Sequence, residues 1–297
     1  MPLLDDKQKA DLLRHFKGLT GEVTVMLFAR PADCDFCKVT TDLLNEVTGL
    51  SPKLQLQVLD VENDQAEAER CGVDKTPAVI VKGAGSEDCR IRFFGAPAGY
   101  EFTTLVEDLL MVSTGKHGLS AEVLAELGKV DQPVRVQVMT LPTCPYCPSM
   151  VRTAHRFALA NKNITADMVE VSEFPALVKF YEVQGVPHTM IGETYGVVGV
   201  YKELDFIQEI LRGIGKLPIE LNEHVQVHEV TGIDSGPNIH EPHPHVHGRG
   251  VPPGSPAPQT GPKGKPRARK VSATAKPAQN PAPKTAAKKA GRKGVKK

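Results

Sequence analysis

Hydrophobic and polar residues in the first part of the chain are spaced as in alternating helices and strands. An amphipathic helix shows apolar side chains on one side, and a half-buried strand alternates apolar with polar residues. The expected elements are, in order, a helix at 4–16, strands at 23–28 and 55–61 separated by a helix at 39–47, a short helix at 62–70, a strand at 78–81, and a strand, turn and helix within 92–110.

The same order of elements returns about 110 residues later. The matched positions are Cys34 and Cys144, Asp60 and Glu170, and Pro77 and Pro187. The expected second set comprises a short helix at 119–127, strands at 134–138, 164–171 and 196–200, helices at 150–158, 174–183 and 204–211, and a strand directly after Pro187. A period this long indicates two copies of a domain, and we expect the second copy to end near Leu217.

Two Cys-x-x-Cys pairs, Cys34/Cys37 and Cys144/Cys147, follow strands and open helices. The unpaired N–H groups at the start of a helix favour a thiolate over a thiol and so lower the cysteine pKa. Residues three apart on a helix are neighbours, so each pair can close into a disulfide. Four thiolates could instead converge on a zinc ion. Zinc ribbons place their cysteines on short hairpin knuckles, however, so this context favours redox chemistry.

The two pairs differ in their neighbouring charges. Asp33 and Asp35 flank Cys34, and their negative charges should raise its pKa, so we expect Cys144 to be the more reactive thiol. The remaining cysteines, Cys71 and Cys89, lie outside both motifs. We interpret them as structural or incidental thiols, because free cysteines are commonly small buried hydrophobic residues.

The strand, Cys-Pro-Tyr-Cys and helix around Cys144 resemble the glutaredoxin and thioredoxin superfamily. Together with the other Cys pair, two Pro residues and the turn Gly-Ala-Pro-Ala-Gly-Tyr-Glu-Phe at 95–102, residues 1–217 resemble the protein disulfide oxidoreductases. These glutaredoxin-like proteins fuse two thioredoxin folds. A similar pair of folds occurs in the amino-terminal domain of the flavoprotein that reduces a bacterial peroxiredoxin, where one fold alone keeps its cysteines.

The resemblance assigns a role to Thr76-Pro77 and Val186-Pro187, which stand where the superfamily places a cis-proline against its cysteines. Each proline follows the second cysteine of its pair by 40 residues, which favours the cis bond over an ordinary turn proline. A cis bond there exposes backbone groups to an extended substrate strand. Thioredoxins also carry a buried acid six residues before the first cysteine. Phe28 and Val138 stand at those positions, so another group or water has to move the proton.

We therefore predict an α/β protein with two tandem thioredoxin-like folds, each a mixed four-stranded sheet flanked by helices. The expected boundaries are 1–117 for the first fold, 118–217 for the second, 218–247 for a His-rich linker and 248–297 for a disordered basic tail. The tail holds 14 basic and no acidic residues, whereas residues 1–247 hold 22 basic and 35 acidic ones. A Pro-, Ala- and Lys-rich segment cannot bury a core.

Two weaker signals lie near the end of the chain. His240, His243, His245 and His247 could bind a metal through neutral imidazoles, although the intervening prolines favour a solvated extended segment, and we assign no metal site. The basic tail could attach to nucleic acid without sequence preference, in a way that salt would abolish. Charged side chains interrupt the first 16 residues, which contain no apolar run, and no run of 18 apolar residues occurs elsewhere, so we expect neither a secretory signal nor membrane association.

These features predict a cytosolic thiol–disulfide oxidoreductase that reduces, forms or isomerises protein disulfides and needs no bound cofactor. The resemblance implies disulfide-containing proteins as partners and a flavoprotein like thioredoxin reductase as the electron donor. Two alternatives stay open, an electron-donor module for a peroxiredoxin and a nucleic-acid-associated binding protein on a thioredoxin scaffold. A scaffold does not need both dithiols intact, so the sequence favours the enzyme.

Overall fold

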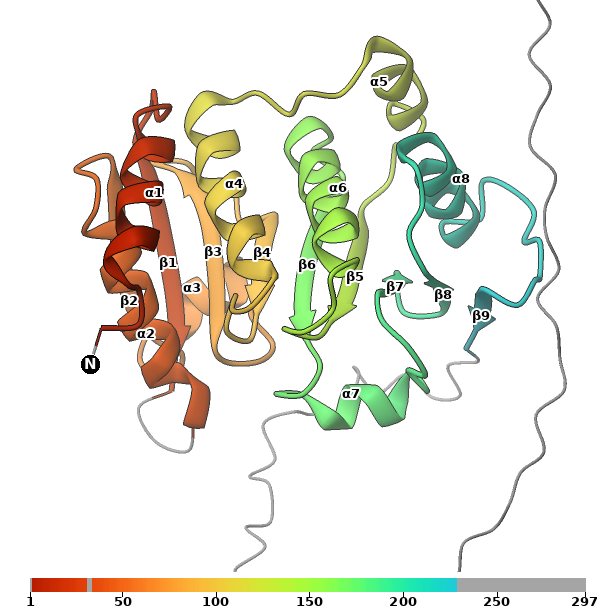
Figure 1. Cartoon of the computed structure of the whole chain (residues 1–297). Helices are drawn as coiled ribbons and strands as arrows, with labels where there is room; N and C mark the ends of the chain where they lie inside the picture. Colours follow the sequence, from red (N-terminus) through yellow and green to blue (C-terminus); the bar gives the residue numbers. More distant parts are fainter. Residues whose placement is uncertain (1, 31–33, 229–297) are drawn as a thin grey trace, which may run out of the picture. The chain divides into compact units, whose positions relative to one another are not determined.

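The computed structural model describes residues 2–30 and 34–228, all of which belong to one compact unit. Its first half follows the predicted order of elements. They are α1 (Asp6–Phe16), β1 (Val23–Ala29), α2 (Asp35–Thr48), β2 (Leu54–Asp60), α3 (Gln65–Arg70), β3 (Ala78–Gly83), β4 (Ile91–Phe94) and α4 (Glu101–Thr114). Figure 1 shows α1, α2 and α4 on one side of this part of the sheet and α3 on the other.

The second half repeats the order strand, helix, strand, helix, strand, strand, helix. Its elements are α5 (Ala121–Leu127), β5 (Val134–Thr140), α6 (Cys147–Ala160), β6 (Ile164–Glu170), α7 (Pro175–Phe180), β7 (His188–Ile191), β8 (Tyr195–Val198), α8 (Glu203–Gly213) and β9 (Val225–Val227). The two predicted thioredoxin-like folds are confirmed. None of the helices in the described ranges has the length and apolar character that a membrane span requires.

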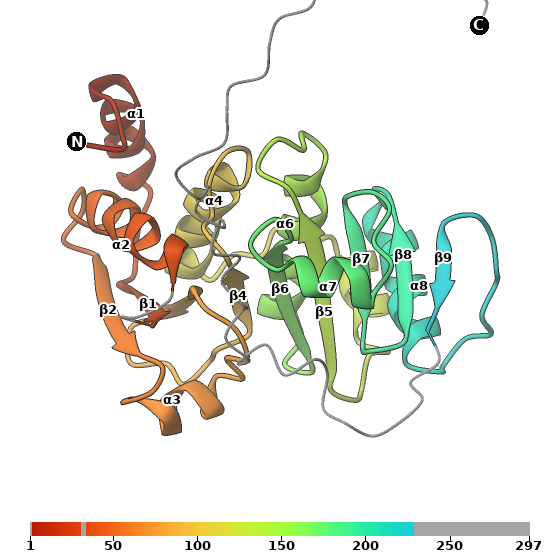
Figure 2. The ribbon, with the colours of Figure 1, turned by 90° about the horizontal axis from the view of Figure 1, so that it is seen from below.

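The two folds share one sheet, a join that the sequence did not predict. Nine strands run in the order β2-β1-β3-β4-β6-β5-β7-β8-β9, and Figure 2 shows this row from below. The join is the parallel pair of β4 and β6, which would each be an edge strand in an isolated fold. Pairing satisfies the N–H and C=O groups that such edges expose to other chains.

A buried charge network holds this join together. Arg92 of β4 lies opposite Asp167 of β6, and its guanidinium donates to both carboxylate oxygens at 2.6 and 3.1 Å. Arg135 of β5 donates to the same carboxylate at 2.6 Å and to Asp74 at 2.6 Å, and Lys75 also pairs with Asp74. These charges hold the pKa of Asp167 below its ordinary value, against the opposing effect of burial.

The sheet continues past Leu217, where we expected the second fold to end. Val225–Val227 pairs antiparallel with β8 inside the range predicted to be a linker, and so covers an otherwise open edge. The histidines at 240–247 and the tail at 248–297 lie outside the described residues.

Side chains of successive residues along a strand point into two different hydrophobic cores, one on each face of the sheet. In β1, Val23, Val25 and Leu27 face a core shared with α1, α2, α4, α6 and α8, whereas Met26 and Phe28 face a second core with α3 and α7. The period of two along a strand produces this division. Burial on both faces explains why residues 23–28 form a continuous apolar run.

Candidate functional site

Cys144 and Cys147 form a disulfide at the end of β5, with their Cα atoms 5.6 Å apart. We expected Cys144 itself to open the helix, but α6 begins at Cys147. The expected electrostatics still hold, because the Cys147 N–H at the helix start donates to Cys144 Sγ at 3.2 Å. Cys147 is fully buried and Cys144 is 8% exposed, so an incoming sulfur reaches Cys144 first.

Cys34 and Cys37 form the equivalent disulfide in the first fold, with Cα atoms 5.4 Å apart. Cys34 is the N-cap residue of α2, and Cys37 is 5% exposed. Both cysteines line a cavity of about 390 Å³. Each pair closes on itself within its own fold, so the zinc site built from all four thiolates is wrong. Asp33 lies outside the described residues, and the higher reactivity of Cys144 stays a prediction.

Both dithiols lie at the same end of the strands, beyond the carboxyl ends of β1 and β5. β1 is antiparallel to β3 and β3 to β4, while β4, β6 and β5 are mutually parallel, so β1 and β5 run in one direction. Each Cys-x-x-Cys pair follows the carboxyl end of one of these two strands. Both active-site candidates therefore open toward the same side of the molecule.

The Thr76–Pro77 and Val186–Pro187 peptide bonds are both cis, as predicted. The register of β1 with β3 places Ala78, the residue after Pro77, opposite Phe28 near the end of β1. In the second fold the contact is direct, because the carbonyl oxygen of Val186 lies 3.7 Å from Cys144 Sγ. Each cis-proline segment thus lies at the end of the strands where its own cysteine pair is found.

An exposed aromatic residue stands between the cysteines of each pair. Tyr146 is 67% exposed and Phe36 is 43% exposed. Exposed large apolar side chains beside a reactive group mark a surface that contacts other molecules.

The sequence did not identify an acid for proton transfer, but the structure offers Glu101. It is 2% exposed in the first turn of α4, where the neighbouring Tyr100 N–H donates to the Pro142 carbonyl of the active-site loop at 3.1 Å. Its Oε2 accepts from Thr104 Oγ1 at 2.7 Å, and its Oε1 has no partner among the described residues. Burial raises the pKa of Glu101 to about 7, close to the value that suits a general base.

The surroundings of Glu101 come from both folds. Within the α4–α6 contact, Asp108 of α4 bonds to His155 Nδ1 of α6 at 2.5 Å, and both side chains are buried. Burial raises the pKa of Asp108, and the charge of His155 opposes that shift. The last helix of the first fold therefore supplies polar groups to the contact with α6, the helix that begins at Cys147. The sequence showed Glu101 inside the segment 95–102, but that segment was interpreted as a turn and Glu101 was not considered as an acid for proton transfer.

Cys71 and Cys89 form a third disulfide, which corrects the interpretation of these residues as structural or incidental thiols. The pair joins the end of α3 to the chain just before β4. Among residues 2–30 and 34–228, no group of three or more His, Cys, Asp or Glu side chains is arranged to hold a metal ion.

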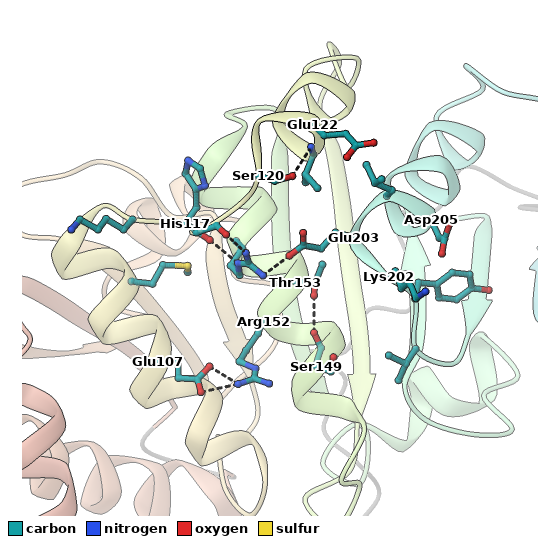
Figure 3. A pocket seen from close by; sticks show the side chains of 18 of the residues that line it. Glu107, His117, Ser120, Glu122, Ser149, Arg152, Thr153, Lys202, Glu203 and Asp205 are labelled. Carbon is teal, nitrogen blue, oxygen red and sulfur yellow. Dashed lines mark hydrogen bonds and ion pairs between the residues drawn. The ribbon is translucent and has the colours of Figure 1, made fainter. Parts of the chain in front are cut away.

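A cavity of about 1280 Å³ lies between α4, α5, α6 and α8 (Figure 3). Two ion pairs lie in its lining. Arg152 pairs with Glu107 at 2.6 Å, and Figure 3 shows these two side chains facing each other. Arg156 pairs with Glu203 at 2.5 Å. The cysteines do not line this cavity. It is therefore separate from both dithiols.

Sequence comparison relates the chain to redox proteins. A family model described as Thioredoxin domain matches residues 134–212. The chain is 26% identical over 195 residues to a protein named NADH dehydrogenase from Bacillus subtilis (strain 168), covering 65% of this chain and 35% of that protein. It is 27% identical over 190 residues to the alkyl hydroperoxide reductase component AhpF from Staphylococcus aureus (strain NCTC 8325 / PS 47), covering 63% and 34%. The chain thus spans about a third of the length of these curated relatives.

Solved structures match over most of their own length. A protein disulfide oxidoreductase from Aeropyrum pernix K1 is 28% identical with a TM-score of 0.66, covering 73% of this chain and 97% of that one. The NTD_N/C domain of alkylhydroperoxide reductase AhpF from Enterococcus faecalis is 25% identical with a TM-score of 0.66, covering 70% and 99%. With two folds, two Cys-x-x-Cys disulfides and two cis-prolines on the same plan, the chain belongs to the thioredoxin superfamily.

Proposed function

We propose that the protein is a thiol–disulfide oxidoreductase acting on disulfides of other proteins. The observation that carries this proposal is the repeated unit of one accessible and one buried cysteine, closed into a disulfide beside a cis-proline. A scaffold would need neither dithiol. In the reduced protein, the Cys144 thiolate attacks a substrate disulfide and expels one substrate thiolate. Cys147 then attacks Cys144, which releases the second substrate thiolate and leaves the Cys144–Cys147 disulfide with two electrons transferred.

Glu101 is the group that we assign to the proton of Cys147. A thiol as buried as Cys147 does not ionise readily, because burial disfavours the charged form. Glu101 packs beside the active-site loop, has an unpartnered carboxylate oxygen, and has a pKa of about 7. Its carboxylate accepts the Cys147 proton as the mixed disulfide is resolved.

The substrate is an extended segment that lies along the cis-proline. The carbonyl of Val186, close to Cys144 Sγ, is available to pair with a substrate backbone N–H, and Thr76 occupies the equivalent place in the first fold. Tyr146 and Phe36 contact apolar side chains next to the substrate disulfide. This arrangement recognises backbone and apolar surface, which suits a range of protein disulfides.

Electrons come from a flavoprotein of the thioredoxin-reductase class, in the cytoplasm. The likeness to the alkyl hydroperoxide reductase component AhpF supports a second candidate function, in which the chain passes electrons to a peroxiredoxin. The two functions share the chemistry of Cys144 and differ in the acceptor. Rates with insulin and with an oxidised peroxiredoxin, compared at equal concentration, separate them.

The test is the reduction of insulin, followed by turbidity with dithiothreitol or with NADPH and thioredoxin reductase. Cys144→Ser and Cys34→Ser each remove one site and leave the other dithiol intact. We expect Cys144→Ser to lose most of the activity. No activity in the parent protein, or full activity in both single-site variants, would refute the enzyme and leave the binding-scaffold alternative.

A further inference from the structure

The Cys71–Cys89 disulfide lies apart from both Cys-x-x-Cys pairs and has no part in the proposed mechanism. Cys71 ends α3, where its N–H donates to the Glu67 carbonyl at 3.0 Å, and Cys89 lies two residues before β4. Their Cα atoms are 5.2 Å apart, within the range that a disulfide requires. The two residues are 18 positions apart in the sequence, so the bond links two elements that meet only in the folded chain.

A surface cavity of about 510 Å³ gives access to this disulfide, and both cysteines line it. Cys89 is 9% exposed and Cys71 is 2% exposed. Two ion pairs line the cavity, Arg70 with Glu87 at 2.9 Å and Arg90 with Asp88 at 2.5 Å. A small uncharged thiol can enter without breaking either pair, and it meets the more exposed Cys89 first.

The disulfide helps to hold the segment 71–77, which leads to the cis-proline of the first site. Arg92 of β4 donates through Nη1 to the carbonyls of Cys71 and Gly72 at 2.8 and 3.1 Å. Gly72 has φ +63°, and a Cβ there would lie 2.6 Å from Arg92 Nη1, so this approach requires glycine. The bond and the arginine together fix the end of α3, a helix of six residues, which is too short to be stable without tertiary contacts.

We propose that Cys71–Cys89 is a third redox couple, which exchanges with low-molecular-weight thiols through this cavity and controls how firmly the segment 71–77 is held against β4. The thiolate of a small dithiol attacks Cys89 Sγ, the Cys71–Cys89 bond breaks, and Cys71 leaves as a thiolate that takes a proton from water. The second thiolate of the reagent then attacks the reagent sulfur that is bonded to Cys89 Sγ in the mixed disulfide. Cys89 is released and protonated, the reagent becomes a cyclic disulfide, and two electrons have moved to the protein.

The first experiment uses the full chain with Cys34, Cys37, Cys144 and Cys147 all changed to Ser, which leaves this pair as its remaining cysteines. A second set with Ala at the four positions guards against misfolding, because Cys37 and Cys147 are buried. Thiols are counted by iodoacetamide labelling and mass spectrometry, before and after dithiothreitol without denaturant. We expect no labelled thiol before reduction, two afterwards, and none after return to oxidised dithiothreitol. Labelling that needs denaturant, or two thiols that never oxidise, would overturn the proposal.

The second experiment tests the route of attack and its consequence. On the same background, Cys71→Ser leaves Cys89 and Cys89→Ser leaves Cys71, and each reacts with 2-hydroxyethyl disulfide as an uncharged probe. Because accessibility limits the attack, we expect Cys89 to react about tenfold faster or more. Hydrogen exchange in 71–77 should rise on reduction, while 183–187 of the second fold stays unchanged. Equal reaction rates would refute the cavity route, and unchanged exchange in 71–77 would refute its control of the segment.

Discussion

Replacing Glu101 by Gln should stabilise the protein above neutral pH and slow its second site. The carboxyl is 2% exposed and faces Asp108 of its own helix and His155 and Arg152 of α6. Burial is the main cause of its raised pKa, with the nearby charges acting in both directions. An amide of the same shape keeps the contact with Thr104 and removes the charge that burial disfavours.

The magnitude follows from linkage. The pKa rises from 4.5 unfolded to about 7 folded, so the folded state binds the proton more tightly and stability falls as pH rises between these two values. One pKa unit corresponds to about 1.36 kcal/mol. Relative to acid pH, the raised pKa of Glu101 lowers the free energy of unfolding by about 3 kcal/mol at pH 8 and by about 1 kcal/mol at pH 5. The free energy of unfolding should therefore drop by about 2 kcal/mol more in the parent than in Glu101→Gln over this range.

Urea unfolding at pH 5 and pH 8 measures this difference, and insulin reduction in a Cys34→Ser background reports the second site alone. We expect Glu101→Gln to slow that site by about a hundredfold, because a positioned general base contributes at least that much. Glu107→Gln, on the surface of the same helix, is the matched control and should change neither quantity. Equal pH dependence in Glu101→Gln and the parent would refute the raised pKa. An unchanged rate would refute the role in proton transfer.

Three further results are expected. Asp167→Asn should lower the free energy of unfolding by about 3 kcal/mol in urea, because it leaves buried Arg92 uncompensated. Asp42→Asn, whose partner Lys38 is exposed, should cost clearly less, and equal losses would contradict this account of the join. Titration of thiolate absorbance in single-site variants should give Cys144 a lower pKa than Cys34, and the reverse order would disprove the ranking. Truncation before Gly248 should keep reductase activity within about twofold while abolishing retention on a DNA column at low salt. Unchanged retention would show that the tail does not bind the polyanion.

Local patterns were sufficient to predict each fold. The apolar run at 23–28, the alternation at 55–61 and the helical spacing after each cysteine pair depend on burial within one element and its immediate neighbours. The cis-prolines could be assigned because their distance from the cysteines repeats. These features specify one fold at a time.

The missed features depend on which surfaces meet after folding. No local spacing indicates that Arg92 and Asp167 lie opposite each other across β4 and β6, or that Cys71 meets Cys89. The chemistry of Glu101 has the same origin, since a carboxyl in the first turn of a helix is ordinarily exposed and favourable there. Its pKa rises mainly because the folded chain buries it, and charged groups of α6 act on it as well.

Because β1 and β5 run in the same direction within one sheet, the molecule presents its two dithiols on the same side and is bivalent. Four strand spacings separate these two strands, which places their ends roughly 19 Å apart. Because the two pairs lie beyond strand ends at this separation, we expect no direct exchange between them within one molecule, and under the proposed function a diffusing donor reduces each dithiol separately. A substrate with two disulfides at a similar spacing is different. Once captured at one site, it meets the other at an effective concentration in roughly the millimolar range, and so remains bound through both reactions.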